Sequence, residues 1–207
     1  MMQKLPPKTE INTVLLPPLK KLEQKMQEIV QILKNGGTIL YPTDTIWGIG
    51  CDAMNIDAIN KVFDIKKREK NKSMIILVDT EQRLQSLVEV PEMAWQIIDL
   101  SEKPITIVYE EAKTLPKELL AEDGSIGIRL VKDDFCRKLI SKLGSPLVST
   151  SANFSGEKSP QKFSDISAEI KSAVDYIAEG HRTEVAKYPA SSIIKVWKDN
   201  RVKVIRA

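Results

Sequence analysis

The sequence predicts an α/β fold built around a mixed sheet that is partly antiparallel. Two observations support this prediction. Short apolar runs of strand length alternate along the chain with segments whose apolar residues recur at helical spacing. The last three apolar runs follow one another without a helical segment between them, which favours antiparallel neighbours in that part of the sheet. At 207 residues the chain is long enough for one domain with its own core.

Helices are expected where apolar residues recur three and four positions apart. In the first of them Leu22, Met26, Ile29 and Leu33 fall on one side, and Gly36 follows as a stop signal. The expected helices cover residues 20–35, 57–67, 82–88, 92–100, 133–143 and 165–174. The expected strands cover residues 38–41, 73–78, 105–109, 125–130, 146–149, 176–178, 191–196 and 202–205.

The composition is that of an ordinary globular protein and sets few limits on function. Hydrophobic residues make up 42% and charged residues 29%, and the net charge of +3 is too small to argue by itself for a nucleic-acid partner. Cys51 and Cys136 form neither a disulfide framework nor a zinc-ligand spacing, so we expect reduced thiols in a cytoplasmic protein. No apolar run approaches the ~20 residues of a membrane span, so no membrane partner is expected.

The chain is expected to form one domain preceded by an arm. Residues 1–18 contain four prolines around a short apolar stretch, and their start lacks the apolar core of a signal peptide. We interpret residues 1–18 as an N-terminal arm and residues 19–207 as a single catalytic domain.

Two polar segments stand directly after strand-like runs. The first reads Tyr-Pro-Thr-Asp-Thr-Ile-Trp-Gly-Ile-Gly at residues 41–50, and the second reads Ser-Thr-Ser-Ala-Asn-Phe-Ser-Gly at residues 149–156. Ligands of open α/β sheets usually sit on loops that leave strand ends, so we expect one site assembled from both segments. Gly48 and Gly50 permit a close approach of a ligand to the backbone. The hydroxyls of the second segment suit either a capped turn or the binding of a nucleotide or carboxylate.

Two residues of the first segment leave alternatives open. Asp44 could hold a metal or an amine, or it could cap a turn. Trp47 is expected to pack in the core rather than against a ligand.

A cationic run covers residues 61–72, where six basic side chains face two acidic ones. One interpretation is a solvated helix end, because Lys and Arg favour that end of the helix dipole. The other is an anion site made by Lys66 and Arg68, which can converge only if the helix ends at about residues 69–72, because residues two apart do not share a helix face. Phosphate sites often combine the point charge of Lys with the planar fork of Arg.

The residues and motifs that the sequence lacks limit the reactions that the protein could catalyse. His181 is the single histidine, so a Ser-His-Asp or Cys-His mechanism and a zinc site are not expected. The chain also lacks the Gly-x-x-x-x-Gly-Lys-Ser/Thr pattern of a P-loop. A reaction on this protein would work by positioning and charge stabilisation, as phosphoryl and nucleotidyl transfer do.

Residues 41–50, 66–68 and 149–156, in this order, resemble the motifs of the YrdC-like family of threonylcarbamoyl-AMP synthases. The resemblance runs from about residue 24 to the end and is to the short, single-domain form. It implies a twisted, open sheet flanked by helices, with a concave basic cleft. It also implies that L-threonine, bicarbonate and ATP, with Mg²⁺, give threonylcarbamoyl-AMP and pyrophosphate. The product would feed the threonylcarbamoyl modification of adenosine 37 (t6A37), with tRNA or a downstream threonylcarbamoyl transferase complex as partner.

The same resemblance implies roles for individual residues. The family's Lys-x-Arg pair matches Lys66 and Arg68, and its Ser-x-Asn pair matches Ser151 and Asn153. These four would form the catalytic set and bind ATP, with no protein ligand for a metal. ATP would also contact Thr106, Ser159 and Arg206. L-Threonine would contact Thr45, Arg129, Ser149 and Ser191.

The implied reaction joins two anions. The threonine amine combines with bicarbonate to give a carbamate, whose oxygen attacks the α-phosphorus of ATP. The repulsion between the anions is about 4 kcal/mol at ~4 Å and an effective dielectric of ~20, and cations with Mg²⁺ would offset it.

Two other functions remain as alternatives. The local positive charge suits an RNA-binding module with a basic cleft and no turnover, although the small net charge weakens this interpretation. A carbamoyl-transfer domain is the other, although such a domain usually sits inside a larger protein.

Overall fold

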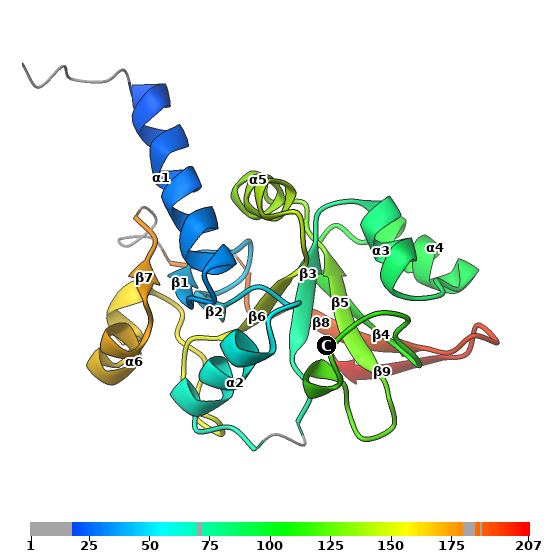
Figure 1. Cartoon of the computed structure of the whole chain (residues 1–207). Coiled ribbons are helices and arrows are strands. Elements are labelled where there is room, and N and C mark those ends of the chain that lie inside the picture. Colours follow the sequence, from blue (N-terminus) through cyan, green and yellow to red (C-terminus); the bar gives the residue numbers. More distant parts are fainter. Residues whose placement is uncertain (1–17, 70–71, 180–184, 187) are drawn as a thin grey trace, which may run out of the picture.

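The computed structural model describes residues 18–69, 72–179, 185–186 and 188–207. The expected arm at residues 1–18 lies outside the described residues, except that Pro18 begins the first helix, and His181 also lies outside them. The described strands form one nine-stranded sheet in the order β7-β1-β2-β6-β3-β5-β4-β8-β9 (Figure 1). Within the described residues, no helix combines the length and the apolar character needed to cross a membrane.

The sheet is mixed, as the sequence predicts, but of the last three strands only β8 and β9 are antiparallel neighbours, because β7 lies at the other edge of the sheet beside β1. Neighbours β3 and β5, β4 and β8, and β1 and β7 run parallel, whereas the other neighbouring pairs are antiparallel. The strands are β1 (Ile39–Tyr41), β2 (Gly48–Gly50), β3 (Ile75–Val78), β4 (Ile105–Tyr109), β5 (Ile126–Leu130), β6 (Leu147–Ser151), β7 (Tyr176–Ile177), β8 (Ser192–Val196) and β9 (Val202–Arg206).

The helices begin at polar capping residues that the sequence places before them. Asn55, Thr80 and Asp133 accept hydrogen bonds from backbone N–H groups in the first turns of α2, α3 and α5. The helices are α1 (Pro18–Lys34), α2 (Ile56–Ile65), α3 (Glu81–Leu87), α4 (Glu92–Leu100), α5 (Asp134–Leu143) and α6 (Ala168–Ala173), with 3₁₀ turns η1 (Lys117–Leu119) and η2 (Phe163–Asp165). The helix expected at residues 165–174 is shorter than predicted because Ser167 caps α6 and η2 ends just before it.

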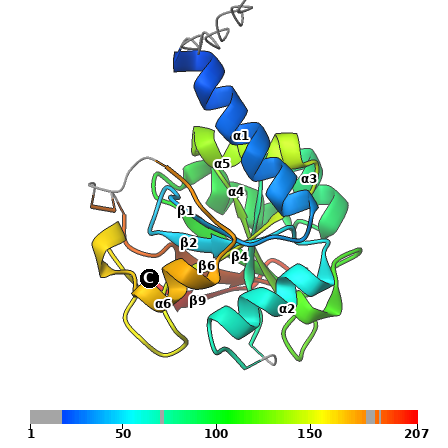
Figure 2. The same cartoon turned by 60° about the vertical axis from the view of Figure 1, so that its left-hand side comes forward.

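Helices pack on both faces of the sheet. Consecutive strand residues point to opposite faces, so Leu77 of β3 packs with the buried residues of α1 and α5, whereas Ile76 and Val78 pack with those of α2. The C-terminal part of α1 lies against the sheet beside α5, and its other end extends away from the sheet (Figure 1; Figure 2). Cover on both faces explains why β3 is a continuous apolar run, whereas β9 at the edge of the sheet is exposed along its length.

The first polar segment was expected to be a loop as far as Gly50, and this expectation is wrong. Residues 48–50 form β2, which pairs antiparallel with β1. A Cβ atom on Gly50 would lie 2.6 Å from the carbonyl oxygen of Val148 and 2.7 Å from Cε1 of Tyr41. The absence of a side chain at Gly50 therefore lets a neighbouring strand and a tyrosine ring approach, rather than a ligand.

The second polar segment also begins as a strand. Residues 149–151 extend β6, and Ser151 lies opposite Gly48 of β2 while Thr150 lies opposite Ile49. The pairing of β2 with β6 brings the two motif segments side by side, although about a hundred residues separate them in the sequence. The prediction that both segments contribute to one place in the fold is therefore confirmed.

Candidate functional site

A cleft of about 860 Å³ opens where the two motif segments meet. The turn between β1 and β2, the chain after α2, β5, β6 and the ends of β8 and β9 all contribute to its walls. The predicted site residues that line it are Thr45, Arg68, Arg129, Ser149, Ser151, Ser159, Ser191 and Arg206. The predicted residues Lys66, Thr106 and Asn153 do not line it.

Cations outnumber acids among the described residues of the cleft wall. The acidic members are Glu122 and Asp123, and Lys195 lies 2.8 Å from the Asp123 carboxylate. Hydrogen bonds from Lys195 and Ser125 lower the pKa of Asp123 to about 2. The basic members are Arg68, Lys72, Arg129, Lys195 and Arg206. Such a wall attracts anionic ligands, because a surplus of one sign of charge in a concave site concentrates its field.

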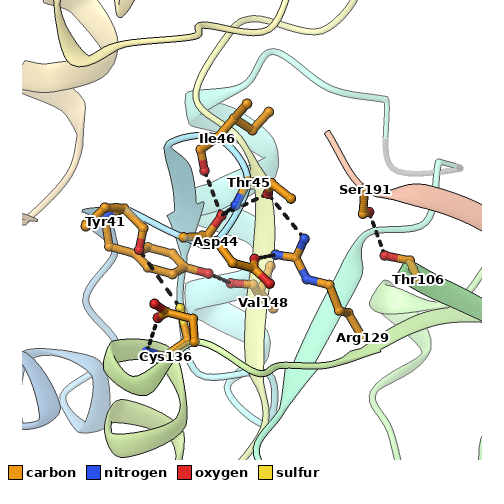
Figure 3. Close-up of polar contacts among 12 residues, drawn as sticks. Tyr41, Asp44, Thr45, Ile46, Thr106, Arg129, Cys136, Val148 and Ser191 are labelled. Carbon is orange, nitrogen blue, oxygen red and sulfur yellow. Dashed lines mark hydrogen bonds and ion pairs between the residues drawn. The ribbon is translucent and has the colours of Figure 1, made fainter. Parts of the chain in front are cut away.

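Arg129 occupies the centre of the site and is almost completely buried (Figure 3). Its Nη1 donates a hydrogen bond of 3.2 Å to Oγ1 of Thr45, and its Nη2 lies 3.3 Å from Oδ1 of Asp44. Burial raises the pKa of the Asp44 carboxyl, and the charge of Arg129 acts in the opposite direction. Asp44 is thus the ion-pair partner of a buried arginine, a role that was not among the alternatives considered for it, and a metal or amine contact of Asp44 stays a prediction.

Lys66 is buried and connects α2 to the end of β6. Its Nζ donates hydrogen bonds of 2.5 Å and 2.6 Å to the carbonyl oxygens of Ser151 and Asn153, and its own carbonyl accepts from the N–H of Ser155. Burial lowers the pKa of Lys66 to about 8, and the nearby charge of Arg68 acts in the same direction. The interpretation of this run as a wholly solvated helix end is therefore wrong for Lys66.

Arg68 leaves the helix and reaches the cleft. The helix expected at residues 57–67 ends at Ile65, before the helix end at about residues 69–72 that the anion-site interpretation assumed, and Lys67 then adopts a positive φ of 50° that turns the chain. Nη2 of Arg68 donates a hydrogen bond of 2.7 Å to the carbonyl oxygen of Ser73, which fixes the guanidinium at the cleft wall. Burial lowers the pKa of Arg68.

Asn153 holds the turn that follows β6. Its Nδ2 donates hydrogen bonds of 2.8 Å and 2.9 Å to the carbonyl oxygens of Phe154 and Glu157. Lys66, Ser151 and Asn153 thus form one connected group, of which Ser151 faces the cleft. Whether Lys66 and Asn153 contact a nucleotide stays a prediction.

Thr106 lies behind Ser191 rather than on the cleft wall. The two hydroxyl oxygens are 2.8 Å apart, and Thr106 is fully buried (Figure 3). Arg206 donates hydrogen bonds of 3.0 Å and 2.6 Å from Nε and Nη2 to the carbonyl oxygen of Ser191. Ser191 is therefore held at both its hydroxyl and its backbone, and Thr106 reaches the cleft only through it.

Trp47 packs in the core, as predicted, but it also lines the cleft, so whether it contacts a ligand stays a prediction. It is 4% exposed, and its ring centroid lies 4.9 Å from that of Phe163. Thr43, for which the sequence predicted no role, makes hydrogen bonds through its hydroxyl to Thr45 and Ile46 in the turn between β1 and β2. The signal that could have found it is the Thr-x-Thr spacing, because alternate hydroxyls in a turn can bond to each other.

These features together define a class of protein: an α/β protein with an open sheet and a cleft whose arginines and hydroxyl groups suit an anionic ligand. Comparison with known proteins gives the family. A family model named Sua5_yciO_yrdC, with the description "Telomere recombination", matches residues 31–207. The chain belongs to this Sua5/YciO/YrdC family.

Two relatives show how far the likeness extends. A Methanocaldococcus jannaschii protein, provisionally named a threonylcarbamoyl-AMP synthase, is 33% identical over 187 residues, which is 88% of this chain and 87% of that protein. A threonylcarbamoyl-AMP synthase of Coxiella burnetii, strain RSA 493, is 29% identical over 159 residues, which is 76% of this chain and 86% of that protein.

Solved structures share the fold. A variant of P. abyssi Sua5 aligns with a TM-score of 0.79 and 23% identity, and covers 89% of this chain and 56% of that one. P. abyssi Sua5 complexed with L-threonine aligns with a TM-score of 0.76 and 24% identity over 84% of this chain and 51% of that one. E. coli YciO has a TM-score of 0.75, 21% identity and 89% coverage of both chains. The chain thus spans only about half the length of the Sua5 chains that it matches.

Proposed function

We propose that this protein is a threonylcarbamoyl-AMP synthase, which forms threonylcarbamoyl-AMP and pyrophosphate from L-threonine, bicarbonate and ATP. The cleft carries this proposal: eight of the eleven site residues implied by the family resemblance line one space, although they come from both halves of the chain. Its volume of about 860 Å³ suits a small-molecule site. The names of the M. jannaschii and C. burnetii relatives support the same reaction.

The reaction suits a cleft that offers charges and hydroxyl groups. The threonine amine adds to bicarbonate to give a carbamate and water. A carbamate oxygen then bonds to the α-phosphorus of ATP, the bond from this phosphorus to the bridging oxygen breaks, and pyrophosphate leaves with the electron pair. The carbamate is already an anion, so this second step needs no histidine to remove a proton.

The protein must hold the carbamate and the triphosphate together against their repulsion, which is about 4 kcal/mol at ~4 Å and an effective dielectric of ~20. Arg68, Arg129 and Arg206 supply positive charge on the cleft wall. Ser149 and Ser151 add neutral hydroxyl groups that can turn toward an oxygen anion. Because these groups are already fixed in place, little reorganisation is needed during the reaction.

Mg²⁺ is expected to arrive with ATP. Within the described part of the chain, no three His, Cys, Asp or Glu side chains are grouped so that they could hold a metal ion. Asp123 in the cleft is already paired with Lys195. Mg²⁺ binds readily to substrate phosphates and keeps several waters, so this wall fits a metal carried by the triphosphate, whose charge it would partly neutralise.

The unstable product would pass to the t6A37 modification, with tRNA or a threonylcarbamoyl transferase complex as the next partner. We place the reaction in the cytoplasm. Cys51 and Cys136 are free and buried, which suits a reducing compartment.

The experiment that tests the proposal measures pyrophosphate with ATP and bicarbonate, in the presence and absence of L-threonine. Release that requires all three substrates is the expected result. Release that is indifferent to L-threonine rejects the proposal and points to carbamoyl transfer. No turnover, together with an RNA affinity that falls steeply with salt, rejects it in favour of an RNA-binding module.

A variant connects this activity to the cleft. We expect Arg68→Ala to reduce pyrophosphate release at least a hundredfold, about 3 kcal/mol of transition-state stabilisation, while the fold stays intact. The matched control is Arg201→Ala, which removes an exposed arginine outside the cleft and should leave the rate unchanged. An unchanged rate in Arg68→Ala would remove this residue from the mechanism.

A further inference from the structure

The turn between β1 and β2 contains a hydrogen-bond network whose proton positions follow from its geometry. Oγ1 of Thr43 lies 2.9 Å from the carbonyl oxygen of Ile46, 3.0 Å from the backbone N of Thr45 and 2.9 Å from Oγ1 of Thr45. A carbonyl oxygen only accepts, so the single hydroxyl proton of Thr43 is donated to Ile46. The proton between the two threonine oxygens must therefore come from Thr45.

The remaining partner of Thr45 is a donor as well. Nη1 of Arg129 donates to Oγ1 of Thr45 at 3.2 Å, because a guanidinium has no acceptor atom. The ion pair with Asp44 holds this arginine in place (Figure 3). The Thr45 hydroxyl thus donates a hydrogen bond to Thr43 and accepts one from Arg129. One lone pair of its oxygen is left for a further donor.

Thr45 lines the cleft, and there its hydroxyl can accept a hydrogen bond through this lone pair but has no proton left to donate. We propose that Thr45 acts in the cleft only as a hydrogen-bond acceptor, and that Thr43 is the positioning residue that enforces this polarity. The substrate group at Thr45 is then a donor, an amine or a hydroxyl. A carboxylate, carbamate or phosphate oxygen is excluded there, because two acceptors repel each other. Naming L-threonine as the substrate rests on the proposed function.

This polarity orients the amino acid in the cleft. Its amine or side-chain hydroxyl lies toward the turn between β1 and β2, and its anionic end is left for the arginines. Freely rotating hydroxyl groups next to cations could bind either the ammonium or the carboxylate end of an amino acid. The fixed orientation of the Thr45 hydroxyl proton therefore selects one orientation of the amino acid.

The first experiment uses the ligand-free protein and needs no turnover. In NMR spectra, the hydroxyl proton of Thr45 should exchange slowly with water and show a nuclear Overhauser contact with Thr43. Thr43→Val keeps the shape but removes the acceptor, and the slow-exchanging signal should disappear. Thr43→Ser keeps the acceptor and should keep the signal. A Thr45 proton that exchanges freely in the native protein, or one that stays protected in a folded Thr43→Val protein, overturns the proposal.

The second experiment compares the native protein with Thr45→Val and with Thr45→Ser as the conservative control. Binding of L-threonine should weaken about tenfold in Thr45→Val, as expected for the loss of one hydrogen bond, and should recover in Thr45→Ser. Three analogues, each lacking one group, then identify the partner: 3-hydroxybutyrate lacks the amine, 2-aminobutyrate lacks the hydroxyl, and 1-amino-2-propanol lacks the carboxylate.

The loss in Thr45→Val should disappear with 3-hydroxybutyrate or with 2-aminobutyrate, and either outcome supports the proposal. A loss that disappears only with 1-amino-2-propanol, a loss that persists with all three analogues, or no loss with L-threonine overturns it. The NMR result separates this inference from the proposed function. A failed pyrophosphate assay leaves the Thr45 proton where it is, and a freely exchanging proton leaves the synthase reaction untouched.

Discussion

The buried amine of Lys66 makes the stability of this protein depend on pH in a way that can be measured. The change is Lys66→Met, which keeps most of the length of the unbranched side chain and removes its charge and donors. At pH 7 it leaves the carbonyl oxygens of Ser151 and Asn153 without the hydrogen bonds of 2.5 Å and 2.6 Å that they now accept. An unpaired buried acceptor costs about 1–3 kcal/mol, so we expect a loss of roughly 2–4 kcal/mol of unfolding free energy.

The pH dependence follows from the lowered pKa of Lys66. The pKa falls from 10.5 to about 8 in the folded protein, mainly because burial disfavours the charged amine. Between these values the unfolded chain binds more protons than the folded chain, so the native protein becomes more stable as the pH rises. The full difference corresponds to about 3 kcal/mol. Lys66→Met lacks this gain in stability. The stability gap, which is the difference in unfolding free energy between the native protein and Lys66→Met, should therefore widen by up to about 3 kcal/mol between pH 7 and pH 10.

Urea unfolding at pH 7, 8, 9 and 10 measures the gap directly, and comparing the two proteins cancels the titration of every other group. The matched control is Lys138→Met, which removes an exposed lysine from α5, and a gap that widens with pH in Lys66→Met alone assigns the effect to the buried amine. A gap that is independent of pH in Lys66→Met would refute the argument, because it would mean that the amine titrates alike in the folded and unfolded chains.

Three further changes test the packing around the cleft. Gly50→Ala should lose about 2–4 kcal/mol of unfolding free energy, measured with urea, because its Cβ would clash with backbone of the adjacent strand. Asp44→Ala should lose about 3 kcal/mol in the same measurement, because the buried Arg129 keeps its charge without a partner; an equally stable variant would mean that the pair is not needed. Thr106→Val should weaken substrate binding about tenfold in calorimetry, and adding Ser191→Ala should cost little more, because both changes break the same hydrogen bond. Additive losses would show that the two hydroxyls act independently.

Periodicity alone predicted most of the helices and strands, because burial on both faces of the sheet leaves a strong apolar pattern. It failed at β2, where two of the three residues are glycines, which are rare in strands. Gly50 is required there by the ring of Tyr41 and the carbonyl of Val148, and both contacts are tertiary. The sequence around Gly50 contains no local sign of them.

The motifs predicted which segments meet, and most of the site residues that they implied line the cleft, but Lys66, Thr106 and Asn153 lie off its wall. In a run of charged residues, Lys66 is typical of a surface lysine. Its burial depends on carbonyl groups more than eighty residues away in the sequence. The position of Thr106 fits the alternation of a strand, yet its hydroxyl faces Ser191 behind the cleft wall. Such placements depend on partners that only the folded chain brings together.

The position of Lys66 bears on how any loss of activity in its variants is interpreted. Lys66 fixes the backbone of Ser151, and Ser151 lines the cleft, so removing the amine would disturb catalysis even without a direct contact between Lys66 and ATP. The two roles predict different responses to variants that remove the charge, Lys66→Met and Lys66→Gln, and to Lys66→Arg, which keeps it. If Lys66 acts only by fixing the backbone, activity and unfolding free energy should fall together across Lys66→Met, Lys66→Arg and Lys66→Gln. If the amine also contacts the nucleotide, activity should fall much further than stability in the neutral variants, and the KM for ATP should rise in them alone.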